Sequence, residues 1–132
     1  MPVRTRAAAT AVSAALLTLA VAAPAAATTP AWSVTHETAH AEGARRITSG
    51  PSSPFQLTLT GTLTNTGAGC YAVWTQFQYD LVPGPPFKAA ALCGPGTAEI
   101  NVVRSIMPTT TGTIFICKGM ESPVDCGPRK YV

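Results

Sequence analysis

Charged side chains are scarce in this sequence. Only 11% of its 132 residues are Asp, Glu, Lys or Arg, with six acids among them, and there are two histidines. Acid–base catalysis and nucleophiles activated by histidine depend on these residue types, so their scarcity makes both kinds of catalysis unexpected. A G-x-S-x-G motif and a phosphate-binding glycine loop are also missing. We therefore expect a non-enzymatic protein without a cofactor and without catalytic residues.

Basic residues do not cluster either. Arg4 and Arg6 stand near the start of the chain, and without them seven basic residues face six acids. The remaining basic residues are scattered, apart from the pairs at 45–46 and 129–130. A nucleic-acid-binding protein needs a basic patch, so we expect no nucleic-acid partner.

Long apolar runs are confined to the first residues. Arg4 and Arg6 precede an apolar stretch over 7–23, which ends in the small residues 24–27. This order is typical of a secretory signal peptide. We predict a signal peptide over 1–27 and a single domain over 28–132. The stretch is short for a membrane span, so the secreted protein should keep no stable membrane anchor.

Four cysteines are present: Cys70, Cys93, Cys117 and Cys126. An even number of cysteines in a short exported chain indicates two disulfides. A structural zinc site would be expected to show a C-x-x-C pair, which the sequence lacks, so we expect no metal. Four cysteines allow three pairings. Cys70 begins one predicted strand and Cys93 ends its predicted hairpin partner, which favours the sequential pairing.

Alternating apolar and polar residues predict an all-β protein. Leu57, Leu59 and Leu63 alternate with threonines over 55–66, as in a half-buried strand. Predicted strands follow at 70–82, 87–93, 98–106 and 113–117. Before them, residues 32–48 suggest two strands with a turn near Gly43, and residues 83–86 a rigid connection. Six to seven short strands separated by Gly and Pro predict a small antiparallel β-sandwich, with a small barrel as the alternative.

Residues His36-Glu37-Thr38-Ala39-His40 spell the zinc-protease motif H-E-x-x-H. On a helix this spacing places two imidazoles on one face for zinc, beside a glutamate that acts as the general base. The segment resembles the metzincin proteases, which have a glycine at the place of Gly43 and a Met-turn like 105–108. The third ligand position holds Arg46, which does not bind zinc. A small zinc hydrolase is therefore an alternative function.

The outer face of the strand over 70–82 is a candidate binding surface. Tyr71, Val73, Phe77, Tyr79 and Leu81 share the face expected to point inward. The opposite face carries Trp74, Gln76, Gln78 and Asp80. An aromatic ring beside amides and a carboxylate suits a sugar, because the ring stacks on C–H groups while the amides bind hydroxyls. The other interpretation is that Trp74 packs under a loop or the tail.

The segment over 61–126 resembles a group of small secreted β-proteins of filamentous actinobacteria, a resemblance that implies no activity. The residues that carry it are Gly61-Thr62-Leu63, Gly69-Cys70-Tyr71, Tyr79-Asp80-Leu81, Cys93-Gly94-Pro95-Gly96 and Asp125-Cys126-Gly127.

A more distant resemblance is to the tendamistat-type α-amylase inhibitors, which are small secreted β-sandwiches with two disulfides. The Trp-Arg-Tyr triplet of that family is missing from 55–65, and Phe55 stands near the place of its first cysteine. The resemblance therefore implies an architecture and not amylase inhibition.

Together these features lead us to expect a secreted, non-enzymatic binding or inhibitory module. Its expected partner is an extracellular polysaccharide or a secreted hydrolase. The alternative to a binding module is a structural protein of the cell surface or envelope.

Overall fold

The computed structural model describes residues 31–50 and 53–132, which are built of β-strands. The predicted signal peptide lies outside them and stays a prediction. In chain order the strands are β1 (Ala31–His36), β2 (Ala39–Gly50), β3 (Ser53–Asn65), β4 (Cys70–Tyr79), β5 (Val82–Cys93), β6 (Gly96–Ile106), β7 (Thr111–Lys118), β8 (Val124–Cys126) and β9 (Lys130–Tyr131). In this part of the chain, no helix is long and apolar enough to cross a membrane.

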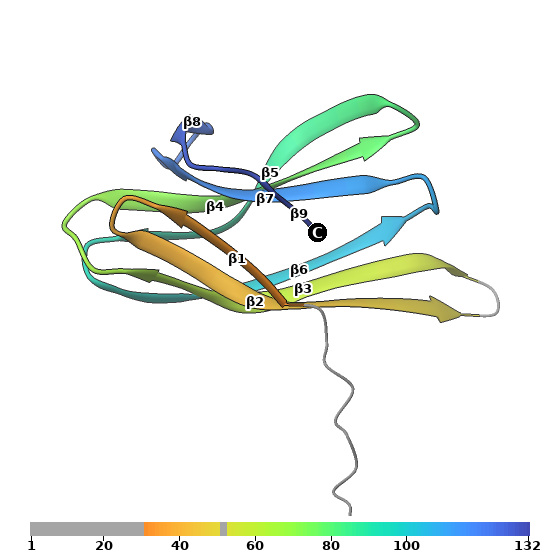
Figure 1. Cartoon of the computed structure of the whole chain (residues 1–132), viewed down its shortest axis with the longest axis horizontal. Helices are drawn as coiled ribbons and strands as arrows, with labels where there is room; N and C mark the ends of the chain where they lie inside the picture. Colours follow the sequence, from red (N-terminus) through yellow and green to blue (C-terminus); the bar gives the residue numbers. More distant parts are fainter. Residues whose placement is uncertain (1–30, 51–52) are drawn as a thin grey trace, which may run out of the picture.

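The strands form two antiparallel sheets that pack against each other (Figure 1). The first sheet has the order β1-β2-β3-β6. The second has the order β5-β4-β7-β8, and β9 also pairs with β7. This arrangement confirms the predicted antiparallel β-sandwich. It has more strands than predicted because the tail after β7 adds the short strands β8 and β9.

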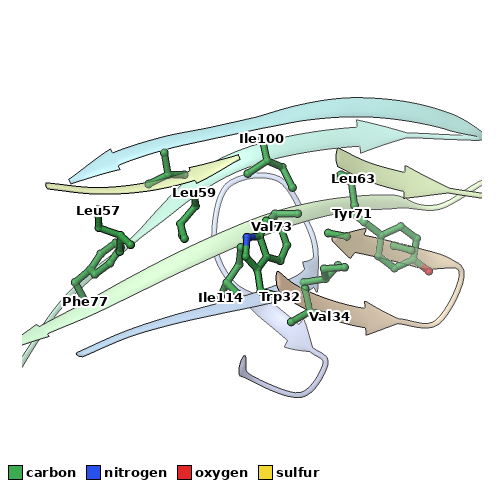
Figure 2. Close-up of a cluster of buried hydrophobic side chains, with 14 of the residues drawn as sticks. Trp32, Val34, Leu57, Leu59, Leu63, Tyr71, Val73, Phe77, Ile100 and Ile114 are labelled. Carbon is green, nitrogen blue, oxygen red and sulfur yellow. The ribbon is translucent and has the colours of Figure 1, made fainter. Parts of the chain in front are cut away.

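The core lies between the sheets and follows the predicted alternation. Leu57, Leu59 and Leu63 on β3 are buried, and they face Tyr71, Val73 and Phe77 on β4 (Figure 2). The alternation predicts these positions correctly because each strand has one face against the opposite sheet. Tyr79 and Leu81 were predicted on the same inward face, but they are 38% and 87% exposed, because β4 ends at Tyr79 and Leu81 lies in the turn.

The turn predicted near Gly43 is wrong, because β2 continues through this residue. Gly43 pairs with Gly61 on β3 and with Trp32 on β1. A Cβ atom built on either glycine would lie within 2.8 Å of the Trp32 indole. The glycines are therefore needed for the close approach of the indole. The β1–β2 turn lies at Glu37 and Thr38, where Glu37 has a left-handed φ of 51°.

The β4–β5 turn also lies earlier than predicted. Asp80 and Leu81 form it, with left-handed φ angles of 46° and 70°. The predicted connection over 83–86 is instead part of β5. Prolines are tolerated there because β5 is an edge strand of the second sheet and its pairing with β4 is irregular between Gln76 and Gln78.

The disulfides join Cys70 to Cys93 and Cys117 to Cys126, which confirms the sequential pairing. In each pair the two cysteines are register partners on neighbouring strands. All four cysteines of the chain are therefore paired. Two disulfides in a small β-domain are consistent with an oxidising environment.

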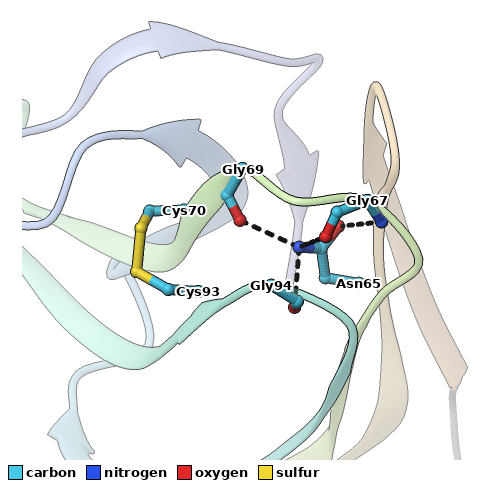
Figure 3. The surroundings of a disulfide bond; sticks show 6 residues. All are labelled: Asn65, Gly67, Gly69, Cys70, Cys93 and Gly94. Atoms are coloured by element: carbon cyan, nitrogen blue, oxygen red, sulfur yellow. Dashed lines mark hydrogen bonds between the residues drawn. A yellow bond between two sulfur atoms is a disulfide. The ribbon is translucent and has the colours of Figure 1, made fainter.

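Asn65 lies near the Cys70–Cys93 disulfide and joins three loops at one end of the sandwich (Figure 3). Its side-chain amide donates to the carbonyl oxygens of Gly67, Gly69 and Gly94 at 2.9, 3.0 and 2.9 Å. Its side-chain oxygen accepts from the Thr38 hydroxyl at 2.7 Å. These bonds satisfy a polar side chain that is only 2% exposed.

Candidate functional site

The outer face of the second sheet carries the residues predicted for binding. The register of β4 against β7 places Trp74 opposite Phe115, Gln76 opposite Thr113 and Gln78 opposite Thr111. Cross-strand partners share a face, so this surface is apolar around Trp74 and polar around the two glutamines. The predicted face therefore exists, but its two halves differ in accessibility.

Trp74 belongs to the buried half, and its interpretation as an exposed stacking platform is wrong. Its side chain is 5% exposed and packs in a second hydrophobic cluster with Ala72, Phe115 and Cys117. The tail is held over this side of the sheet by the Cys117–Cys126 disulfide and by Arg129, whose guanidinium lies 4.0 Å from the centre of the Phe115 ring. Of the two alternatives for Trp74, the structure supports packing under the tail.

The polar half forms a groove of about 350 Å³. Four side chains on the central strands line it: Gln76, Gln78, Thr111 and Thr113. Pro83 on the neighbouring β5 and Tyr131 on the neighbouring β9 also line it. Tyr131 is 78% exposed, so it replaces Trp74 as the accessible aromatic ring of this face.

Arg129 and Gln76 are fixed by each other at the groove. Arg129 Nη1 donates to Gln76 Oε1 at 2.6 Å, and Gln76 Nε2 donates to the carbonyl oxygen of Gly84 at 3.0 Å. Gln78 is partly exposed, and its amide has no side-chain hydrogen bond within the described residues. It therefore remains available for a ligand.

Asp80, the last predicted binding residue, lies apart from this groove. It stands in the β4–β5 turn, where its carboxylate accepts a hydrogen bond from the Thr109 hydroxyl at 2.9 Å. The bond connects two neighbouring loops at the end of the sandwich. Asp80 does not line the groove, so we assign it to the loop contact and not to the site.

The sequence pattern does not predict the positions of Arg129 and Tyr131 at the groove. The tail shows little apolar periodicity, and β9 is only two residues long, which is too short to give a strand pattern. The cysteine pairing nevertheless indicates where the tail lies. The predicted Cys117–Cys126 disulfide returns the chain to the edge of β7, so the residues after Cys126 had to lie near this sheet.

The H-E-x-x-H motif forms a hairpin and not a helix. His36 ends β1 as the partner of Ala39, whereas His40 lies on β2 as the partner of Thr35. The two imidazoles therefore point to opposite faces of the hairpin. His40 Nε2 lies 3.4 Å from Glu42, and His36 Nε2 lies 3.4 Å from Asp125. The motif thus lacks the paired ligands of a metzincin zinc site.

His36 and Glu37 instead join Asp125 of the tail in a cluster of potential metal ligands. Lys118 already supplies a cation there. Its ammonium forms ion pairs with Glu37 and, at 3.2 Å, with Asp125. Tyr71 donates to the second oxygen of Glu37 at 2.6 Å. A metal ion would have to displace the ammonium, so we interpret the cluster as an anchor that ties the tail to the β1–β2 turn.

Glu37 and Lys118 keep each other charged. Hydrogen bonds from Lys118 and Tyr71 lower the pKa of the Glu37 carboxyl below its ordinary value of 4.5. Hydrogen bonds to Glu37 and Asp125 raise the pKa of the Lys118 ammonium above its ordinary value of 10.5. Glu37 therefore stabilises the fold above pH 4.5, and this contribution is lost as the pH falls through its lowered value. The contribution of Lys118 is present below pH 10.5 and is lost as the pH rises through its raised value.

A Glu37→Gln variant is expected to melt slightly below the wild type near neutral pH. The difference should shrink as the pH falls from 4.5 through the lowered pKa of the folded state, because the wild-type carboxyl is then neutral in both the unfolded and the folded state. Melting temperatures measured across this range test the expectation, with the exposed Glu99→Gln as the control. A difference that stays constant into strong acid would contradict the assigned ion pair.

Comparison with protein-family models, with curated proteins and with solved structures finds no match. The resemblances drawn from the sequence therefore stay predictions.

Proposed function

We propose that this protein is a secreted, non-enzymatic module that binds an extracellular polysaccharide in the groove on the second sheet. The observation that supports the proposal is the combination of an exposed Tyr131 ring with the side chains of Gln78, Thr111 and Thr113 in one groove. The predicted signal peptide and the two disulfides support an extracellular location.

The groove has the chemistry that sugars require. A pyranose ring has apolar C–H faces, which stack on an aromatic ring, and a rim of hydroxyl groups, which need donors and acceptors. Tyr131 offers the ring, and the amide of Gln78 and the hydroxyl of Thr111 each offer both donor and acceptor. The Thr113 hydroxyl donates to the backbone carbonyl oxygen of Gln76 at 3.4 Å, so it offers a ligand its acceptor lone pairs.

The groove is preformed. Its floor belongs to β4 and β7, which are hydrogen-bonded in continuous register over eight residue pairs. Gln76 and Arg129 hold each other in place beside it. A ligand therefore loses little binding free energy to ordering of the protein.

Binding suits this groove better than hydrolysis. Glycoside hydrolysis uses a pair of carboxylates on either side of the scissile bond. Among the described residues, no Asp or Glu lines the groove. The site can therefore hold a sugar, but it offers no acid and base to cleave one.

Pull-down on insoluble polysaccharides tests the proposal, with cellulose, chitin, xylan and bacterial cell walls as the set. We expect the wild type to bind at least one of them and Tyr131→Ala to bind it about tenfold or more weakly, because stacked aromatic rings dominate such sites. The melting temperature of Tyr131→Ala should not change, since the ring is 78% exposed.

Tyr79→Ala is the matched control, because it removes the same side chain from a partly exposed position outside the groove. It should retain the wild-type affinity. Equal binding by Tyr131→Ala and the wild type, or no binding to any of these polysaccharides or to a soluble acidic polysaccharide, would refute the proposed function.

A further inference from the structure

Arg129 is the charged side chain among the described residues that line the groove. Its guanidinium makes one side-chain hydrogen bond in the described part of the chain, through Nη1 to Gln76, and its remaining N–H groups have no partner there. It also forms no ion pair with a described carboxylate. The groove therefore contains a positive charge that no described acid neutralises.

The guanidinium is also held in place. One of its faces is stacked on the Phe115 ring, 4.0 Å from the ring centre. Gln76 holds one nitrogen, and Gln76 is itself anchored to the Gly84 carbonyl oxygen. An exposed arginine normally loses rotamer entropy when it binds a ligand. Here the side chain has already lost much of its rotamer entropy on folding, because the stacking and the hydrogen bond fix it before a ligand binds.

A fixed guanidinium with free N–H groups suits a planar anion. Arginine binds a carboxylate through two parallel N–H···O bonds, which gives both strength and orientation. The other polar groups of the groove are neutral and suit sugar hydroxyls. The ligand that matches both parts is a sugar that carries a carboxylate.

We infer that the groove selects an acidic polysaccharide, with a uronate carboxylate on Arg129 and a sugar ring on Tyr131. This inference rests on the proposed function and specifies its ligand class. Selectivity comes from Arg129, because a neutral polysaccharide leaves its free N–H groups without an anionic partner.

The test compares matched polymers. Polygalacturonate, alginate and hyaluronate are each measured beside their carboxyl-reduced, neutral forms, by affinity electrophoresis and titration calorimetry of the wild type. We expect at least one acidic polymer to bind about tenfold or more tightly than its neutral form. This preference should weaken as the salt concentration rises, because the contact is between exposed charges.

Variants then assign the preference to one residue. Arg129→Gln should remove the preference for the acidic polymer over its neutral form. Lys130→Gln is the matched control, since it removes the same charge from the next residue, which does not line this groove. It should keep the preference. Melting curves of both variants establish that the fold is intact.

The outcomes separate the two proposals. Equal binding of acidic and neutral forms, or a preference that survives Arg129→Gln in folded protein, would overturn the ligand class and leave polysaccharide binding standing. Stronger binding of a glycerol-phosphate polymer than of any uronate would overturn the carboxylate assignment. Failure of every acidic and neutral polymer to bind would overturn both proposals.

Discussion

Replacement of Trp74 by alanine is expected to lower the free energy of unfolding by about 3–5 kcal/mol. The indole is 5% exposed and is the largest side chain in the cluster beneath the tail. Its removal leaves a cavity that the neighbouring strands cannot fill, because the Cys117–Cys126 disulfide holds the tail in position. For a domain of this size the melting temperature should fall by more than about 10 °C.

The same variant distinguishes packing from binding. At a temperature where Trp74→Ala is folded, we expect it to bind polysaccharide as the wild type does. Tyr131→Ala should show the opposite behaviour, with a normal melting temperature and weak binding. Trp74→Phe should be less destabilised than Trp74→Ala, because the smaller ring still fills part of the site. An unchanged melting temperature in Trp74→Ala would show that the tail does not cover the indole.

The contrast between Trp74 and Tyr131 shows what the sequence can predict of the site. Alternation along β4 places Trp74, Gln76 and Gln78 on the outer face correctly, because a strand has only two faces. Alternation does not tell whether another segment covers that face. The covering tail is held by one disulfide and by contacts of Arg129, which are not visible in a local pattern. The sequence therefore predicts which side chains share the outer face, but not which aromatic ring on that face is exposed.

The two misplaced turns have a related cause. Gly43 was interpreted as a turn residue, whereas it serves the packing of Trp32 against Gly61 within a continuous sheet. The turns lie at Glu37 and at Asp80 and Leu81, which adopt left-handed φ angles without glycine. Propensity places glycine in such turns. Here Gly43 is needed in mid-strand, where a side chain would clash with Trp32. The turns are therefore made by residues other than glycine.

Replacement of Asn65 by aspartate is the second change with a large expected effect. The two side chains have the same shape, so no cavity forms. The change replaces the Asn65 side-chain NH₂ group with a carboxylate oxygen. This NH₂ group donates to the carbonyl oxygens of Gly67, Gly69 and Gly94 (Figure 3). A carboxylate oxygen about 3 Å from three carbonyl oxygens makes no hydrogen bond to them and is repelled by them. The side chain is 2% exposed, so water cannot solvate the new charge.

We expect Asn65→Asp to lower the free energy of unfolding by about 3–5 kcal/mol near neutral pH, as the loss of a buried hydrogen-bond network does. Asn65→Ala should cost less, because it leaves the carbonyl groups unpaired but introduces no charge.

The pH dependence of Asn65→Asp identifies the cause. Burial and repulsion should raise the folded-state pKa of the new carboxyl above its unfolded value of about 3.9. The folded variant then favours the protonated side chain, so its deficit relative to the wild type should be small in acid and grow as the pH rises through the unfolded value. Urea unfolding across this range measures the deficit, with the exposed Asn101→Asp as the control. A deficit that does not change with pH would mean that repulsion at the three carbonyl oxygens is not its cause, and wild-type stability at neutral pH would show that Asn65 does not hold these loops together.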